Sequence, residues 1–507
     1  MKIERKKNAA RNVVFGVIQR AYNMVMPFIM RTAMIYLLGV EYLGLNSLFT
    51  SILQVLNLAE LGVGSAMVFS MYKPIAADDD KTICALMKLY RFYYRVIGAV
   101  VLIAGLIILP FIPKLISGDV PADINVYLLY LLNLLATVFT YWLFAYRNSI
   151  LNAYQRNDVI SKITMVTSTI QYGIQLFVLY AFHNYYYYVI AILATQILNN
   201  AITAIASKKM YPNYDPKGDL PKEKIKSINQ RVRDVFTSKV GATILNSADT
   251  IVISSFLGLR VLAIYQNYYY IMSAVMSIYS IFFNSMTAGI GNSLITESDD
   301  KNYRDYKKVT LMTFIGMSIC MSEMLCLYQP FMNIWVGEKL MLPFPMVILF
   351  CIYFFCVEYV MLASAYKDAA GIWHEDRFRP LISGLANLVM NILMVQHWGL
   401  YGIILSTILS SGLISAPWIT HNLFNLIFKA KIKNYMPKLI YYCIMIVFCM
   451  AVSYGIGHLI PAGNILMLLV RTVVVFTISG GITLLMVYKM PEFKSLESMA
   501  KGMLKRK

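Results

Sequence analysis

The feature that most constrains this chain is a succession of about fourteen hydrophobic stretches, each about twenty to thirty residues long, between residues 12 and 488. A helix needs about 20 apolar residues to cross ~30 Å of hydrocarbon, and it satisfies its own backbone groups there. The composition agrees, because 59% of the residues are hydrophobic and only 14% are charged. We therefore expect an all-α polytopic membrane protein with about 14 transmembrane helices.

The expected spans share this apolar character and are separated by short polar segments. They are 12–38, 43–72, 92–113, 123–147, 158–182, 185–207, 235–257, 261–291, 309–335, 342–366, 379–397, 400–427, 438–459 and 464–488. One longer polar segment, 208–234, is rich in lysine and separates six spans from eight. Its later part, 221–233, predicts a short amphipathic helix on the inner membrane surface.

The positive charge of the chain is a topology signal. The net charge is +19, and most of the 45 Lys and Arg residues fall in or beside every second loop, beginning with the amino terminus. The intervening loops hold only Lys114, Arg260 and Lys339. Because cytoplasmic loops carry the excess of Lys and Arg, both termini are predicted to be cytoplasmic. No nucleic-acid partner is needed to explain the charge.

Two segments of similar sequence indicate an internal repeat. LGVEYLG (residues 38–44) joins the first two spans, and LGLRVLA (residues 257–263) joins the seventh and eighth. The residue that follows Arg20 by the same distance in sequence as separates these two segments is Lys239, a second cation at a similar helix position. Because each copy has an even number of spans, the repeats are parallel, with a cleft expected between them. The predicted domains are two parallel-repeat six-helix lobes, 1–207 and 235–429, a cytoplasmic linker, 208–234, and accessory helices 13 and 14 with a tail, 430–507.

Polar residues inside three spans predict a hydrated cavity. Arg20, Asn23 and Arg31 share one face of the first span, and the two arginines lie about three turns, or ~16 Å, apart. A charge at mid-bilayer costs at least ~2.5–3.5 kcal/mol, so this face needs water or counter-charges. The second span carries a stripe that includes Gln54, Asn57 and Glu60, and the seventh carries Lys239, Asn246 and Asp249.

These side chains suit a bulky anionic substrate with many hydroxyl groups. Arg20 and Arg31 can bind phosphate through charge-assisted hydrogen bonds, and Lys239 adds a point charge. The amides can exchange hydrogen bonds with sugar hydroxyls. Glu60 and Asp249 are candidates for coupling or gating. Alternatively, the arginines pair with these acids to hold helices together, and Arg31 reaches the outer interface.

The sequence contains no recognisable catalytic or metal-binding pattern. It has no phosphate-binding loop of the Walker type, and no histidine pairs with another histidine or a cysteine at metal-ligand spacing. The longest polar segment is too short to hold a nucleotide-sugar domain. We therefore expect no enzyme activity, no metal and no cofactor.

Three segments resemble bacterial polysaccharide flippases of the Wzx type, which belong to the multidrug/oligosaccharidyl-lipid/polysaccharide exporter superfamily. They are LLGVEYLGLNSLFTSILQVLNLAELGVGSAMVFSMYKPIA (37–76), NSILNAYQRNDVISKI (148–163) and KDAAGIWHEDRFRPLISGLANLVMNILM (367–394). The resemblance implies two six-helix bundles around a cationic cavity that opens alternately to either side. Within the family, basic cavity residues bind pyrophosphate or acidic sugars, and Arg20, Arg31 and Lys239 match this role by position.

The implied function is a flippase for oligosaccharide repeat units linked to undecaprenyl pyrophosphate, acting in the bacterial cytoplasmic membrane. Implied partners are the lipid-linked oligosaccharide and membrane lipids, with a polysaccharide polymerase and chain-length machinery as further candidates. A count of fourteen spans also resembles the lipid II flippases of the superfamily, whose last two helices form a groove for the lipid tail. A drug/cation antiporter of the same fold is the other alternative, although it would need an acidic cavity.

Overall fold

The protein is built from helices, as the hydrophobic pattern predicts. The computed structural model describes residues 5–60 and 62–505, and every regular element within these ranges is helical. Eleven helices are long and apolar enough to cross a membrane, and a bent helix pair is a twelfth candidate. One of the eleven, Lys239–Thr296, has 58 residues, and its length of about 87 Å allows two crossings. The arginines of α1 (Arg5–Leu37) lower its hydropathy, so it is not among the eleven. If the bent pair counts as one span, Lys239–Thr296 as two and α1 as one more, the number is the expected fourteen.

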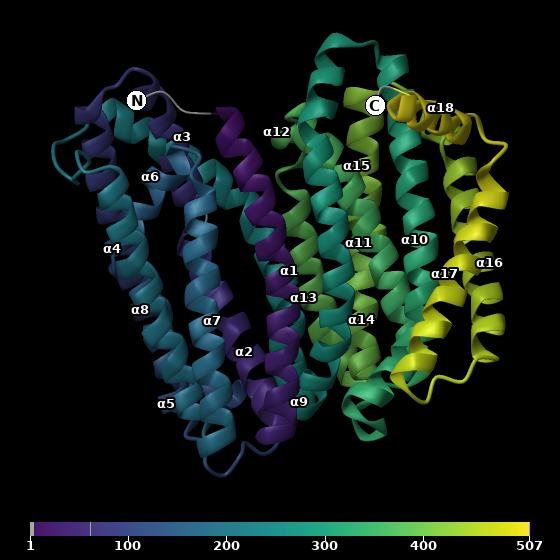
Figure 1. Ribbon diagram of the computed structural model, residues 1–507, viewed down its shortest axis with the longest axis horizontal. Coiled ribbons are helices and arrows are strands. Elements are labelled where there is room, and N and C mark those ends of the chain that lie inside the picture. The colour runs from purple at the N-terminus through teal and green to yellow at the C-terminus, as the bar shows by residue number, and fades with distance from the viewer. Residues whose placement is uncertain (1–4, 61, 506–507) are drawn as a thin grey trace. The chain divides into compact units, whose positions relative to one another are not determined.

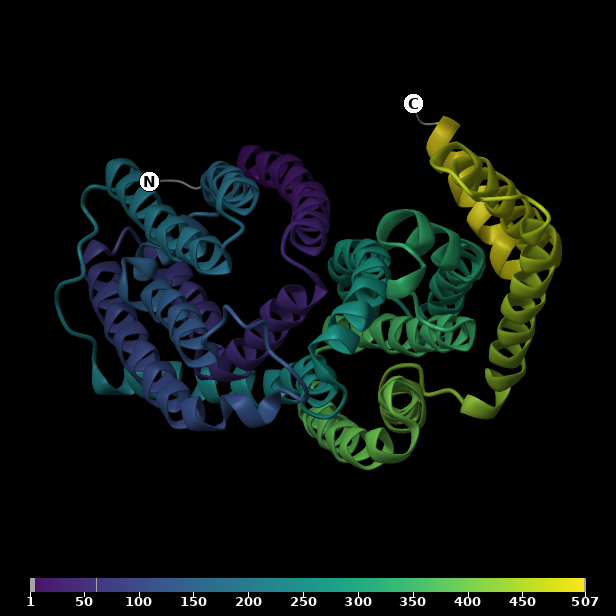
Figure 2. The same cartoon turned by 90° about the horizontal axis from the view of Figure 1, so that it is seen from below.

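The chain forms two compact units, Met1–Ala263 and Ile264–Lys507, and Figures 1 and 2 show that each is a bundle of helices. The boundary falls within α9 (Lys222–Thr296). The first part of α9 therefore belongs to the first unit, and the predicted domain borders stay a prediction. The grouping of spans into two six-helix repeats stays a prediction.

The first unit begins with α1, which packs along α7 and α2. Its elements after α1 are α2 (Val40–Leu56), η1 (Asn57–Glu60), α3 (Val63–Ala76), α4 (Asp80–Ile108), η2 (Leu109–Leu115), α5 (Val126–Trp142), η3 (Ala145–Arg147), α6 (Asn148–Ala153), α7 (Asn157–Phe182), α8 (Tyr185–Met210) and the first part of α9. Several helices start at a side-chain cap, since Asp79, Asn125 and Asn184 accept backbone N–H bonds at the starts of α4, α5 and α8.

Two predicted spans of the first unit are not continuous helices. Span two breaks between α2 and α3, where η1 intervenes and Gly62 adopts a φ of 94°. Span four breaks after α5, where Phe144 has a φ of 59° and the chain bends by 46° into η3 and α6. The second break frees the Thr140 carbonyl, which accepts a 3.2 Å bond from Asn200 Nδ2. The predicted spans 43–72 and 123–147 thus correspond to a candidate span and to a bent helix pair, each with a local break in its helix.

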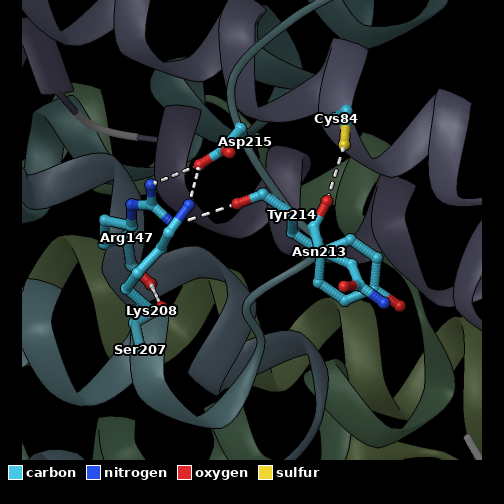
Figure 3. Close-up of polar contacts among 7 residues, drawn as sticks. All are labelled: Cys84, Arg147, Ser207, Lys208, Asn213, Tyr214 and Asp215. Carbon is cyan, nitrogen blue, oxygen red and sulfur yellow. Dashed lines mark hydrogen bonds and ion pairs between the residues drawn. The ribbon is translucent and has the colours of Figure 1, made fainter.

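The segment after α8 is docked on the first unit rather than extended (Figure 3). Arg147 is buried, and its guanidinium donates to the Tyr214 carbonyl at 2.9 Å and to the Asp215 carboxylate at 3.0 Å. Lys208 donates to the same carboxylate at 2.6 Å. Residues 221–233, where the sequence predicts a short amphipathic helix, contain the start of α9, which begins at Lys222 and has non-helical φ and ψ angles at Gly258.

The second unit starts with the later part of α9. Its further elements are α10 (Asp299–Val336), η4 (Glu338–Leu340), α11 (Phe344–Ala370), α12 (Trp373–Asp376), α13 (Arg379–Trp398), α14 (Leu400–Leu409), η5 (Ser410–Ser415), α15 (Ala416–Asn422), η6 (Leu423–Ile427), η7 (Ile432–Asn434), α16 (Met436–His458), α17 (Ile465–Val487) and α18 (Pro491–Lys505). Helix α10 packs against α11, α16 and α17. Helix α18 lies across one end of this bundle (Figure 1).

Helices α13 and α14 form a hairpin joined by buried polar side chains. Asn387 Nδ2 donates to Thr407 Oγ1 at 2.9 Å, and Asn391 Nδ2 donates to Asn387 Oδ1 at 3.2 Å. Ser406 in turn donates to Asn391. Gly402 permits this approach, because a Cβ there would lie 2.4 Å from the Met394 carbonyl oxygen. Hydrogen bonds and a small residue thus hold the two helices together, as is common between membrane helices.

Candidate functional site

The first unit contains a polar groove beside both helix breaks. It consists of two cavities of about 720 and 340 Å³ that share Thr140 in their walls, and we call them together the first-unit groove. The larger cavity is lined by Glu60 from the first break and by Ala145 from the second. Amide side chains dominate its polar lining: Asn46, Gln54, Asn57, Asn133, Asn148, Asn152, Asn157, Gln196 and Asn200. Interrupted membrane helices commonly mark substrate sites, because irregular backbone at that depth must line a cavity or be covered by protein.

Glu60 is held in the groove by tyrosines of α4. The Tyr94 hydroxyl donates to Glu60 Oε1 at 2.9 Å, and the Tyr90 hydroxyl donates to that of Tyr94 at 2.8 Å. The two rings meet edge to face with centroids 4.5 Å apart. Lys239 of α9 also attracts the Glu60 carboxylate electrostatically. The Glu60 carboxyl group is therefore fixed at the groove wall by a protein hydroxyl donor.

The break in span two is fixed from the opposite wall of the groove. The Tyr141 hydroxyl of α5 donates to Asn57 Oδ1 at 2.9 Å, and its ring lies 5.6 Å from that of Tyr94. Asn148, at the start of α6, lines the larger cavity, and its buried Oδ1 has no hydrogen-bond partner among the described residues. An unsatisfied buried acceptor is costly, so a ligand hydroxyl group at this position would be favourable.

The predicted site residues are distributed unevenly around this groove. Gln54, Asn57 and Glu60 lie in its walls. Lys239 is exposed on α9 and acts on Glu60, and Asp249 is buried further along the same helix. The structure thus brings Glu60 and Lys239 near each other. The roles assigned to these residues stay predictions.

The arginines of α1 lie elsewhere in the first unit. Arg20 and Asn23 are exposed, whereas Arg31 is half-buried and acts electrostatically on Tyr188. None of these three lines the first-unit groove. The side chain of Asn246 lies outside the described part of the structure.

Sequence reasoning missed the aromatic side of the groove. Tyr90, Tyr94 and Tyr141 line the larger cavity together with Asn148 and Asn200. The spacing of Tyr90 and Tyr94 places both on one face of α4, which was an available signal. The pairing of Tyr141 with Asn57 had no comparable signal, because it depends on the packing of α5 against the break in span two.

Comparison with known proteins shows the fold of this chain. No family model and no curated protein sequence matches it significantly. Among solved structures, it is similar to the lipid II flippase MurJ in an inward closed conformation, with a TM-score of 0.66 and 15% identity over 93% of this chain and 99% of MurJ.

Two MATE transporters have the same architecture. An inward-facing multidrug resistance MATE family transporter of the MOP superfamily matches with a TM-score of 0.60 and 14% identity, over 81% of this chain and 98% of that one. A eukaryotic MATE transporter matches with a TM-score of 0.59 and 12% identity, over 82% and 96% of the two chains. This multi-pass membrane protein therefore has the fold of the MOP superfamily of flippases and exporters.

Proposed function

We propose that the protein is a flippase that moves undecaprenyl-pyrophosphate-linked oligosaccharide repeat units from the inner to the outer leaflet of the bacterial cytoplasmic membrane by alternating access. The observation that carries this proposal is the first-unit groove, which combines amides, hydroxyls and tyrosine rings with a single carboxylate, that of Glu60. Amides and hydroxyls replace the hydrogen bonds that sugars make with water, and aromatic rings offer faces to the apolar side of a sugar ring.

The size of the groove supports a substrate of this class. Its larger cavity of about 720 Å³ falls within the range of about 300–1,000 Å³ that is usual for small-molecule sites. The unpartnered Oδ1 of Asn148 provides an acceptor for a sugar hydroxyl group. We propose that Arg20, Arg31 and Lys239 bind the pyrophosphate, because guanidinium and ammonium groups form charge-assisted hydrogen bonds with phosphate oxygens.

The predominance of neutral amides and hydroxyls in the groove weighs against a cationic drug as the substrate. A site for cations needs carboxylates that are not already compensated, whereas Glu60 accepts a bond from Tyr94 and is attracted by Lys239. A lipid II flippase is the stronger second candidate. Its specific support is the likeness to MurJ over 93% of this chain and 99% of MurJ.

The test is to delete the gene in its host and to locate the lipid-linked oligosaccharide by leaflet. We expect accumulation on the cytoplasmic side, restored by the intact chain but not by Arg20→Ala or Lys239→Ala at equal protein amount. Lys339→Ala, a change at an exposed cation outside the predicted site, is the matched control and should restore export. Accumulation of lipid II would favour the second candidate. Normal surface polysaccharide with altered drug sensitivity would contradict both flippase assignments.

A further inference from the structure

A pocket of about 600 Å³ lies at one end of the second unit, between α10, α11 and the turn that joins α16 to α17. This end is opposite to α18 (Figure 1). The charge distribution of the sequence predicts that it faces the outer side of the membrane. Its walls include the apolar side chains of Leu325, Met341 and Phe344 as well as Tyr454 and Arg471.

Arg471 is the notable residue of this pocket. It is only 6% exposed, although it sits in the second turn of a membrane helix. Its Nη1 donates a long bond of 3.4 Å to the Ile460 carbonyl, and its Nε is buried without any hydrogen-bond partner. Among the residues that the structure describes, Arg471 makes no ion pair. Burying a guanidinium with one long hydrogen bond and no ion pair costs free energy unless an anion binds to it.

The surroundings of Arg471 define what this anion is. Phe344 and Tyr454 have ring centroids 5.2 Å apart, and Tyr454 stacks on His458 at 5.7 Å, so one wall is flat and largely apolar. Glu338 is exposed and also lines the pocket. Its negative charge disfavours a multiply charged phosphate and therefore favours a singly charged diester. A phosphodiester with attached hydrocarbon chains fits both the arginine and the apolar wall.

We propose that this pocket binds the phosphate of an anionic phospholipid of the outer leaflet. Nε and one Nη of Arg471 donate to two phosphate oxygens, in the bidentate geometry that a guanidinium provides. The beginning of an acyl chain packs on Phe344 and Met341. The bound lipid then fixes the α16–α17 pair against α10, and this role does not depend on which substrate the protein carries.

The proposal is tested by native mass spectrometry of the full-length protein titrated with phosphatidylglycerol or with a diacylglycerol of the same acyl chains. We expect retention of phosphatidylglycerol alone. Arg471→Gln should lower the apparent affinity for phosphatidylglycerol at least about tenfold, because the positive charge and the paired N–H donors of the guanidinium are lost together. Arg471→Lys should lower it less, and Lys339→Gln, which removes an exposed charge at the same end of the unit, should not change it.

A second variant separates lipid binding from folding. Ala462→Phe fills the pocket while the guanidinium remains, and we expect it to lose phosphatidylglycerol to the same extent as Arg471→Gln. Equal retention of both lipids, or unchanged binding in Ala462→Phe, would overturn the proposal. Displacement of the lipid by millimolar inorganic phosphate would show a site for free anions instead and would also overturn it.

Discussion

The Tyr94 hydroxyl of α4 donates a 2.9 Å hydrogen bond to the carboxylate of Glu60, the last residue of the turn that interrupts span two. This bond joins the wall of the first-unit groove to the point where the helix breaks. Tyr90 extends the network by donating to Tyr94. Side chains of α4 thus support the irregular backbone at this point.

Tyr94→Phe tests the network directly. The change removes one hydrogen bond to a charged group, which contributes about 1.5–3 kcal/mol. We expect a lower unfolding temperature of the purified protein and reduced export. Tyr180→Phe is the matched control, because Tyr180 is 76% exposed on α7. An equal effect of the two changes would show that the bond to Glu60 has no special importance.

Gly402→Ala tests the close approach of α13 and α14. The new Cβ would lie 2.4 Å from the Met394 carbonyl oxygen, so the helices must separate, and overpacking of this kind costs about 1–3 kcal/mol. We expect a clear loss of thermal stability. Gly173→Ala in α7 meets nothing within 4 Å and should be neutral or stabilising. Similar unfolding temperatures of the two variants would refute the steric argument.

Glu358→Gln tests an unpaired acid in the second unit. Glu358 is 0% exposed, and neither carboxylate oxygen has a hydrogen-bond partner among the described residues. Because no ion pair is lost, we expect the unfolding temperature to stay the same or to rise.

Asp376→Asn provides the contrast to this change. Asp376 is 2% exposed and binds Arg379 through two bonds of 2.7 and 2.8 Å. Breaking such a buried pair costs about 3–5 kcal/mol, so this variant should be much less stable. A larger destabilisation by Glu358→Gln than by Asp376→Asn would contradict the distinction between the two acids.

The docked segment after α8 should loosen at low pH. Hydrogen bonds from Lys208 and then from Arg147 lower the pKa of Asp215 below its ordinary value of about 3.9. Its contribution to docking is therefore fully present above about pH 4 and is lost as the pH falls through the lower, folded-state pKa. The hydrogen-exchange protection factors of residues 211–219 should fall in that range. In Asp215→Asn the exchange should be faster already at neutral pH and should no longer show this step.

The helical fold was predictable because hydropathy is a local property, and the fourteen hydrophobic stretches correspond to helices in the structure. The polar stripe of span two was visible for the same reason, since Gln54 and Asn57 are spaced at helical intervals. The break after Trp142 was not visible. No proline marks it, and Phe144 adopts its positive φ without a glycine. It is supported by tertiary bonds such as that from Asn200 to the Thr140 carbonyl, which no short stretch of sequence contains.

The polar hairpin of α13 and α14 has a consequence for biogenesis. Asn387 and Asn391 lie at the middle of α13, where single amides would face hydrocarbon if this helix left the translocon alone. Their partners Ser406 and Thr407 are synthesised 15 to 20 residues later, after the turn at Gly399. The ribosome thus delivers both helices almost together. The two helices are therefore expected to enter the lipid as a preassembled pair, so that the unit of membrane insertion here is the hairpin rather than the single span.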